Sequence, residues 1–310
     1  MTVRSRGRRP LHGFSALLAG GATALAVGLA SPAVEAQNLP PLQPGNGGGF
    51  DFRLFRPAID SKGQFSVNGT DILGAWDVAF GLVVDYGRSL GRIGMDPNTM
   101  RPTRSLVENQ FNGTFVANVG LFNWLVFGIQ LPFHLSDGPG GANGLDTAQY
   151  NANRNGLSFQ GIGDLALNLK LRLLRAEVHH FGVAILFQAG FALNNDANGS
   201  VGARNFVGEP GPASLWPSIA LEWRPVRIFR VDLNFGYRHF FGTGSTLTPA
   251  GATTGVTYSP PLTAGLGMSV RVIPAMELVA ETYMNMYTSA LGNPNAMPWE
   301  VVGGLKVFVQ

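Results

Sequence analysis

The stretch GIGDLALNLKLRLL (161–174) decides the fold, because its apolar residues recur at every second position. Leucine occupies the odd positions from 165 to 173, and the even positions hold small or polar residues, among them Asp164, Asn168, Lys170 and Arg172. On a helix these leucines would be spread around the axis, whereas on a strand they share one face. The stretch therefore predicts a β-strand with one apolar face. In a soluble sandwich that face would meet a core, and in an outer-membrane barrel it would meet lipid.

The composition of the 310-residue chain favours the membrane alternative. Hydrophobic residues make up 45% of the chain and charged residues only 13%, about half of the roughly 25% that is usual in soluble domains. After residue 40 there is no run of about 18 apolar residues, which excludes membrane-spanning helices. These properties suit a membrane β-barrel, with a large secreted β-sandwich as the alternative. The chain has no cysteine, which excludes disulfides, thiolate metal sites and a cysteine nucleophile.

The first 36 residues have the pattern of a cleavable signal peptide. Four arginines precede an apolar stretch from Phe14 to Ala30, and the small-residue pattern Val34-Glu35-Ala36 follows. This order predicts export by the Sec route and cleavage after Ala36. Four of the 22 basic residues and one of the 19 acidic residues lie in this segment, so eighteen of each sign remain. A mature chain without net charge is not expected to bind nucleic acid.

Alternation of apolar and polar residues continues along the mature chain and predicts an all-β fold, an up-and-down antiparallel transmembrane β-barrel of ten strands. Residues 37–73 are expected to be a periplasmic linker or plug segment, and residues 74–310 the barrel. If 50–56 and 64–68 paired as a hairpin in the wall, the barrel would have twelve strands; residues 50–73 could instead lie inside it as a partial plug. The ten expected strands cover about 76–86, 105–121, 124–135, 161–174, 181–193, 214–224, 228–240, 262–272, 276–287 and 299–309.

The connections between these strands alternate in length, as they do in outer-membrane barrels with long external loops and short periplasmic turns. Aromatic residues gather near both ends of the strands, which is typical of interfacial girdles. We therefore expect the protein in the cell outer membrane, with both termini in the periplasm. The long connections are 87–104, 136–158, 194–213, 241–261 and 288–298, and the short ones are 122–123, 174–180, 225–227 and 273–275.

Two short patterns resemble known families. The motif Gly-x-Gly-Asp at 161–164, followed by alternating leucines, resembles a motif of the outer-membrane transporter family named for the MetA pathway of phenol degradation. FRPAIDSKGQFSVNG (55–69) with LGAWDVAFGLVVDYG (73–87) resembles the barrel region of large OmpA-family proteins. Together they cover about residues 50–310 and imply an outer-membrane barrel that passes small solutes, hydrophobic ones included. Large OmpA-family chains often continue into a peptidoglycan-binding domain, whereas this sequence stops at VFVQ, so it is expected to be a barrel-only relative or a truncated sequence.

Polar residues on the inward faces of the expected strands are candidates for lining the lumen. Their charges are nearly balanced, so strong ion selectivity is not expected. A ten-stranded barrel is narrow, since barrels of eight strands are already filled by side chains. Two interpretations stay open: a passive channel or transporter for small solutes, and a structural envelope barrel with a closed lumen. The candidates are Asp77, Asp85, Glu108, Asp164, Lys170, Arg172, Glu222, Arg230, Asp232, Arg238, Arg271 and Glu281.

An outer-membrane hydrolase is a third interpretation. It would need a histidine beside an acid or a serine at the outer rim, and His134 with Ser136 and Asp137, or His239 alone, are its candidates. A histidine at a strand end is more often a solvated rim residue, so we do not expect an enzyme. The histidine pair at 179–180 has no further ligands at metal-binding spacing, and neither a metal nor a cofactor is expected.

The expected partners follow from the location. Arg88, Arg92, Arg101 and Arg104 cluster in the first long connection and could bind the phosphates of lipopolysaccharide, with a solvated loop as the alternative. Outer-membrane lipid, the barrel-assembly machinery and a small-molecule solute are the other expected partners.

Overall fold

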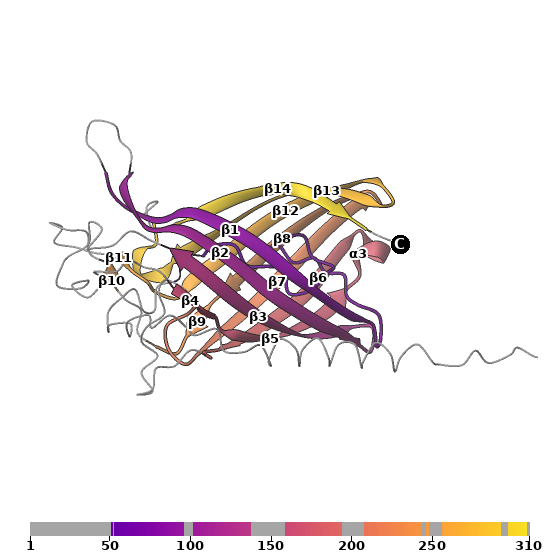
Figure 1. Cartoon of the computed structure of the whole chain (residues 1–310). Helices are drawn as coiled ribbons and strands as arrows, with labels where there is room; N and C mark the ends of the chain where they lie inside the picture. The colour runs from indigo at the N-terminus through magenta and orange to yellow at the C-terminus, as the bar shows by residue number, and fades with distance from the viewer. Residues whose placement is uncertain are drawn as a thin grey trace, which may run out of the picture. The chain divides into compact units, whose positions relative to one another are not determined.

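The computed structural model describes residue 51 and residues 53–95, 102–137, 159–193, 208–242, 246–247, 256–292 and 297–308. The main sheet consists of ten long antiparallel strands, each paired with the next long strand along the chain. It curls into a half-barrel with the first and last of these strands at its edges (Figure 1). The strands are β1 (Val78–Met95), β2 (Pro102–Leu121), β3 (Leu125–Asp137), β5 (Leu165–Leu174), β6 (Phe181–Phe191), β7 (Ala213–Val226), β8 (Phe229–Tyr237), β12 (Pro261–Ile273), β13 (Met276–Tyr287) and β14 (Trp299–Val307).

The all-β, up-and-down fold with ten strands is therefore confirmed. The alternative of twelve long strands is wrong, because the described residues from 51 to 77 contain no strand. The predicted signal peptide lies outside the described residues, as do most of the expected long loops.

The remaining elements are short. β4 (Phe159–Ile162) extends the pairing of β3, and β9 (His239–Phe240) extends that of β7. A separate two-stranded hairpin joins β10 (Thr246–Leu247) to β11 (Val256–Thr257). A four-residue helix, α3 (Ala176–His179), lies in one short connection, and a 3-10 turn, η1 (Thr288–Ala290), follows β13. No helix in the described ranges is long and apolar enough to cross a membrane.

The two faces of the sheet have opposite chemistry, as β5 shows. Leu169 is 41% exposed on the outer face, whereas its neighbours Asn168 and Lys170 are buried on the inner face. The outer face continues from Phe80 on β1 to Val301 on β14 as a row of exposed large apolar side chains. A water-soluble protein rarely exposes an apolar surface of this extent, and lipid is the environment that suits it. The polar side chains that a soluble sheet would present to water lie inside instead.

Three boundaries differ from the expectations. Most of 87–104 is strand rather than loop, because β1 and β2 stay paired up to Met95 and Pro102. Main-chain hydrogen bonding between strands does not require alternating apolar residues. The alternation of apolar and polar residues therefore did not predict a strand in this glycine- and arginine-rich stretch. The stretch 161–174 is interrupted at Gly163 and Asp164, where β4 ends and β5 begins. The connection 174–180 contains α3.

Candidate functional site

Residues 53–73, here called the internal segment, contact the inner face of the half-barrel. The segment has no regular secondary structure, and Ile59, Asp60, Val67 and Thr70 are among its buried residues. An irregular backbone must find partners for its N–H and C=O groups. Some of those partners lie within the segment, as where the N–H of Ala58 donates to the C=O of Phe65 at 2.9 Å, and others are inward-facing side chains of the wall.

Four wall side chains hold the main chain of the internal segment. Glu222 on β7 accepts hydrogen bonds from the N–H and the hydroxyl of Thr70 at 2.9 and 2.7 Å. Glu281 on β13 accepts from the N–H groups of Ser66 and Val67 at 2.8 and 2.9 Å. Two amides complete the set.

Asn234 on β8 bonds to both the N–H and the C=O of Asn68, at 2.7 and 2.8 Å. Gln130 on β3 donates to the C=O of Ala58 at 3.1 Å. Side chains of the wall therefore satisfy part of the segment's main chain, and hydrogen bonds within the segment satisfy another part.

Charged side chains of the internal segment also have wall partners. Lys170 Nζ on β5 lies 2.9 Å from Asp60 Oδ2, and both side chains are completely buried. Gln64 Nε2 donates to Asp232 Oδ2 on β8 at 2.7 Å, and Arg230 Nε lies 3.1 Å from the same carboxylate oxygen. The interior is thus an alternation of opposite charges with bonded amides between them.

Arg224 on β7 fixes the end of the internal segment. Its Nη2 lies 2.7 Å from Asp71 Oδ2 and also contacts Glu222, and its Nη1 lies 3.8 Å from Glu177 on α3. Burial alone would raise the pKa of Asp71, but the hydrogen bond and the charge of Arg224 outweigh burial and lower it. Asp71 is therefore held as a carboxylate.

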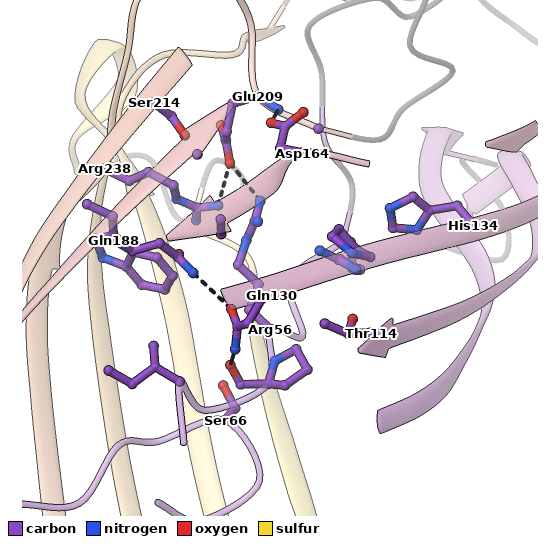
Figure 2. Close-up of a pocket in the computed structure, with 18 of the residues that line it drawn as sticks. Arg56, Ser66, Thr114, Gln130, His134, Asp164, Gln188, Glu209, Ser214 and Arg238 are labelled. Atoms are coloured by element: carbon purple, nitrogen blue, oxygen red, sulfur yellow. Dashed lines mark hydrogen bonds and ion pairs between the residues drawn. The ribbon is translucent and has the colours of Figure 1, made fainter. Parts of the chain in front are cut away.

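A second group of charges lies where the start of the internal segment meets residues 208–209 and 238 (Figure 2). Glu209 Oε1 lies 2.6 Å from both Arg56 Nη2 and Arg238 Nη1, and Arg56 also pairs with Asp51 at 2.6 Å. Tyr258 donates to Glu209 Oε2 at 2.9 Å. Burial, together with the charge of Glu209, raises the pKa of Tyr258 well above its ordinary value, so the hydroxyl stays protonated.

A cavity adjoins these charges, with an empty volume of about 750 Å³ including the open space at its mouth. Gln188 and Gln130 are hydrogen-bonded on one side of it, at 2.9 Å (Figure 2). Ile59 and Trp216 contribute apolar surface. The cavity lies beside the internal segment, and both polar and apolar side chains line it.

The predicted lining residues divide into three groups. Lys170, Glu222, Asp232, Arg238 and Glu281 are buried in the interior, and Asp85, Asp164, Arg172 and Arg230 are partly buried. Three others, Asp77, Glu108 and Arg271, are exposed and do not line the lumen.

Each of these three corrections has a local reason. Asp77 precedes β1 and accepts a hydrogen bond from the N–H of Gly74 in a turn. Glu108 lies where β2 is still paired with β1 but its described pairing with β3 has ended at Asn109, and here Val107 is the buried residue while Glu108 is exposed. Arg271 lies near the short turn after β12, where its guanidinium stacks 5.1 Å from the Phe308 ring.

Sequence reasoning missed the partners that come from the internal segment and the loops: Asp60, Gln64, Asp71 and Glu209. The alternation used to assign facing exists only in strands, and these residues lie outside strands. Three of them are in the stretch that the alternatives had left undecided. The only signal that the sequence offers for them is the presence of charged residues, Asp60 and Asp71, in that stretch.

The two histidines of the hydrolase interpretation have the following contacts in the described part of the chain. His134 is buried, and its Nδ1 lies 2.7 Å from Asn112 Oδ1, an amide rather than a carboxylate. His239 packs against the rings of Tyr237 and Phe241. Within the described residues there is no group of three or more histidine or acidic side chains that could hold a metal ion.

Of the arginines proposed for lipopolysaccharide, Arg88 is exposed; the side chains of Arg92, Arg101 and Arg104 lie outside the described part.

Comparisons with known proteins give only distant structural neighbours. No family model matches the chain, and no curated protein matches it. Among solved structures the chain is similar to the toluene transporter TodX of Pseudomonas putida, with 12% identity, a TM-score of 0.39, and coverage of 77% of this chain and 71% of TodX. It is also similar to the outer membrane protease OmpT of Escherichia coli, with 14% identity, a TM-score of 0.28, and coverage of 77% and 99%.

Proposed function

We propose that the chain is an outer-membrane β-barrel that passes small solutes through its lumen, and that the internal segment acts as the plug of this passage. The observation that carries the proposal is the way the segment is held. It contributes no strand to the wall; side-chain hydrogen bonds, ion pairs and two small apolar clusters, at Ile59 and at Ile72 and Leu73, hold it in place. The segment can therefore leave the lumen without breaking any strand pairing of the wall, and water can take over the hydrogen bonds that it releases.

The charge pattern indicates a passage without strong ion preference. Lys170, Arg224 and Arg230 are each matched by carboxylates at 4.0 Å or less. A lumen whose fixed charges cancel does not concentrate ions of one sign. We therefore expect uncharged or internally neutral solutes to pass in preference to simple ions.

Single-channel recording in a planar bilayer tests the proposal. Residues 37–310 would be refolded and compared with a form that lacks residues 37–73, both checked for a folded barrel by heat-modifiable gel mobility. We expect small or intermittent conductance from the first and larger, steadier conductance from the second. Two folded forms that both fail to conduct would contradict the proposal.

A structural barrel with a closed lumen is the second candidate, and one observation favours it. Ion pairs and hydrogen bonds tie the internal segment to β3, β5, β7, β8 and β13, which is what a permanent filling would require. The same recording separates the candidates, because a permanent filling predicts silence from the full-length mature chain under all conditions.

A further inference from the structure

A groove lies between the two edge strands of the half-barrel, β1 and β14, towards the end that carries the short turns (Figure 1). In the described part of the chain each edge strand is paired on one side only, β1 with β2 and β14 with β13. The start of β1, the end of β14 and the internal segment line the groove. Its empty volume is about 1010 Å³, including the open space at its mouth, compared with about 750 Å³ for the cavity in Figure 2.

The walls of the groove are largely apolar, and a ligand can reach them. Gly81, on the inner face of β1, is exposed, and a Cβ added there would meet nothing within 4 Å beyond its chain neighbours in the described structure. Inward positions on a central strand are buried instead, as Asn168 and Lys170 are on β5. The partly exposed apolar residues that line the groove are Phe55, Phe65, Ala79, Val83 and Phe308.

Three of the polar side chains in the lining are engaged within the protein. Asp60 pairs with Lys170, and Gln64 donates to a carboxylate of β8. Lys306 donates to the C=O of Gly63. A polar ligand would have to compete for these groups, so the groove suits an apolar ligand better.

The groove is continuous with the surface that faces lipid. Phe80 and Val307 line it, and both belong to the outer face, where they are 73% and 67% exposed. The molecules at its mouth are therefore the acyl chains of the bilayer. An apolar void loses van der Waals contacts, and water finds few partners in it. An acyl chain fills such a space without leaving an apolar medium.

A positive charge beside the groove fits the headgroup of a lipid. The guanidinium of Arg271 lies 5.1 Å from the ring of Phe308, which lines the groove. The Arg271 side chain is 50% exposed, and its ion pair with Glu277 is long, at 3.7 Å. Arg271 can therefore bind a phosphate near the short turn after β12.

From these observations we propose that the groove binds a phospholipid of the surrounding bilayer. One acyl chain lies between β1 and β14, and the phosphate contacts Arg271. The lipid seals the half-barrel where the described edge strands are not paired with each other. The inference goes beyond the proposed function, because the lipid is bound whether or not the lumen conducts.

Native mass spectrometry of the refolded mature chain in detergent tests the proposal, with dioleoylphosphatidylglycerol as the probe. We expect one phospholipid to stay on the folded protein. Dioleoylglycerol has the same acyl chains but no phosphate, and we expect about two- to fivefold less of it to be retained. Absence of a retained phospholipid would overturn the proposal, and equal retention of the two lipids would overturn the contact with Arg271.

Two substitutions with matched controls locate the site. Gly81→Phe fills the groove and should abolish lipid retention, whereas Gly303→Phe places the same ring on the outer face of β14, where there is also room for it, and should not. Arg271→Gln should lower retention of the phospholipid to that of dioleoylglycerol. Arg172→Gln, near another short turn, is its control. Equal retention by the two glycine variants, with both folded by gel mobility, would overturn the assignment.

A photochemical crosslink tests the site on the unaltered chain. The protein would be refolded into vesicles that contain phosphatidylglycerol with a photoreactive acyl chain, and the attachment points would be located by peptide mass spectrometry. We expect attachment at Ala79 and Val83, on the inner face of β1, as well as at Phe80 on its outer face. Attachment to the outer face alone would contradict a chain bound in the groove.

Discussion

Lys170 Nζ and Asp60 Oδ2 lie 2.9 Å apart in an interior that excludes both side chains from solvent. The pair joins the middle of β5 to a segment 110 residues earlier in the chain. Removal of two charges from water is expensive, and their mutual attraction offsets this only while both are present. This pair is thus one of the buried contacts that couple the position of the internal segment to the wall.

Loss of one member of this pair should therefore destabilise the protein strongly. Lys170→Met leaves the Asp60 carboxylate buried without its partner, and we expect the free energy of unfolding to fall by about 3–5 kcal/mol. Urea titration of the refolded protein, followed by tryptophan fluorescence, measures this change.

The double variant Lys170→Met with Asp60→Leu is the control for that measurement. With both charges replaced by apolar groups, most of the lost stability should return. A double variant as unstable as Lys170→Met would show that the charge left behind is not the cause.

Asp71 should make stability depend on pH in the acidic range. Its folded-state pKa lies below the unfolded value of about 3.9. Its stabilising contribution is therefore fully present above that value and is lost as the pH falls through the lowered folded-state pKa. Asp71→Asn should lower the free energy of unfolding by about 1–2 kcal/mol at pH 7 and by progressively less below pH 4, as measured by urea titration.

Glu177→Gln is the control, because it removes a more exposed partner of the same Arg224 and should have little effect on stability at any pH. Equal costs for the two variants would contradict this.

The outer face should be intolerant of charge where it meets lipid. Leu169→Arg places a guanidinium in the middle of β5, and we expect a cost of about 2–4 kcal/mol and poor assembly into vesicles. Val178→Arg makes the same kind of change at an exposed apolar residue of α3, outside the strands, and should be tolerated. Similar assembly yields for the two variants would show that the exposed strand face is not in lipid.

The wall of the fold could be predicted from the sequence, because its signal is local. In β5 the leucines and the polar residues alternate with a period of two, and the structure places Leu169 outside and Lys170 inside. Glu222, Asp232 and Glu281 were assigned inward by the same argument, and all three are buried.

The partners of those residues could not be predicted in the same way. Asp60 and Thr70 lie in an irregular segment, where no periodicity tells which way a side chain points. Their contacts join residues more than 100 positions apart, so they follow only from the three-dimensional path of the segment. Glu108 shows a different failure, since alternation predicts that it faces inward, whereas Glu108 is exposed and Val107 beside it is buried.

The most direct test of the plug is a reversible crosslink between the internal segment and the wall. The chain has no cysteine. A Cβ placed at Gly182 would lie 3.0 Å from Thr70 Cβ, which is shorter than the roughly 3.5–4.5 Å found in disulfides, so the internal segment must move slightly away from β6 when the bond forms. Conductance of the variant Thr70→Cys with Gly182→Cys would be recorded in a planar bilayer, oxidised and then reduced, with each single variant as a control. We predict a silent channel when the disulfide is formed and conductance when it is reduced. Equal conductance in both states, or silence in both, would contradict the role of residues 53–73 as a movable plug.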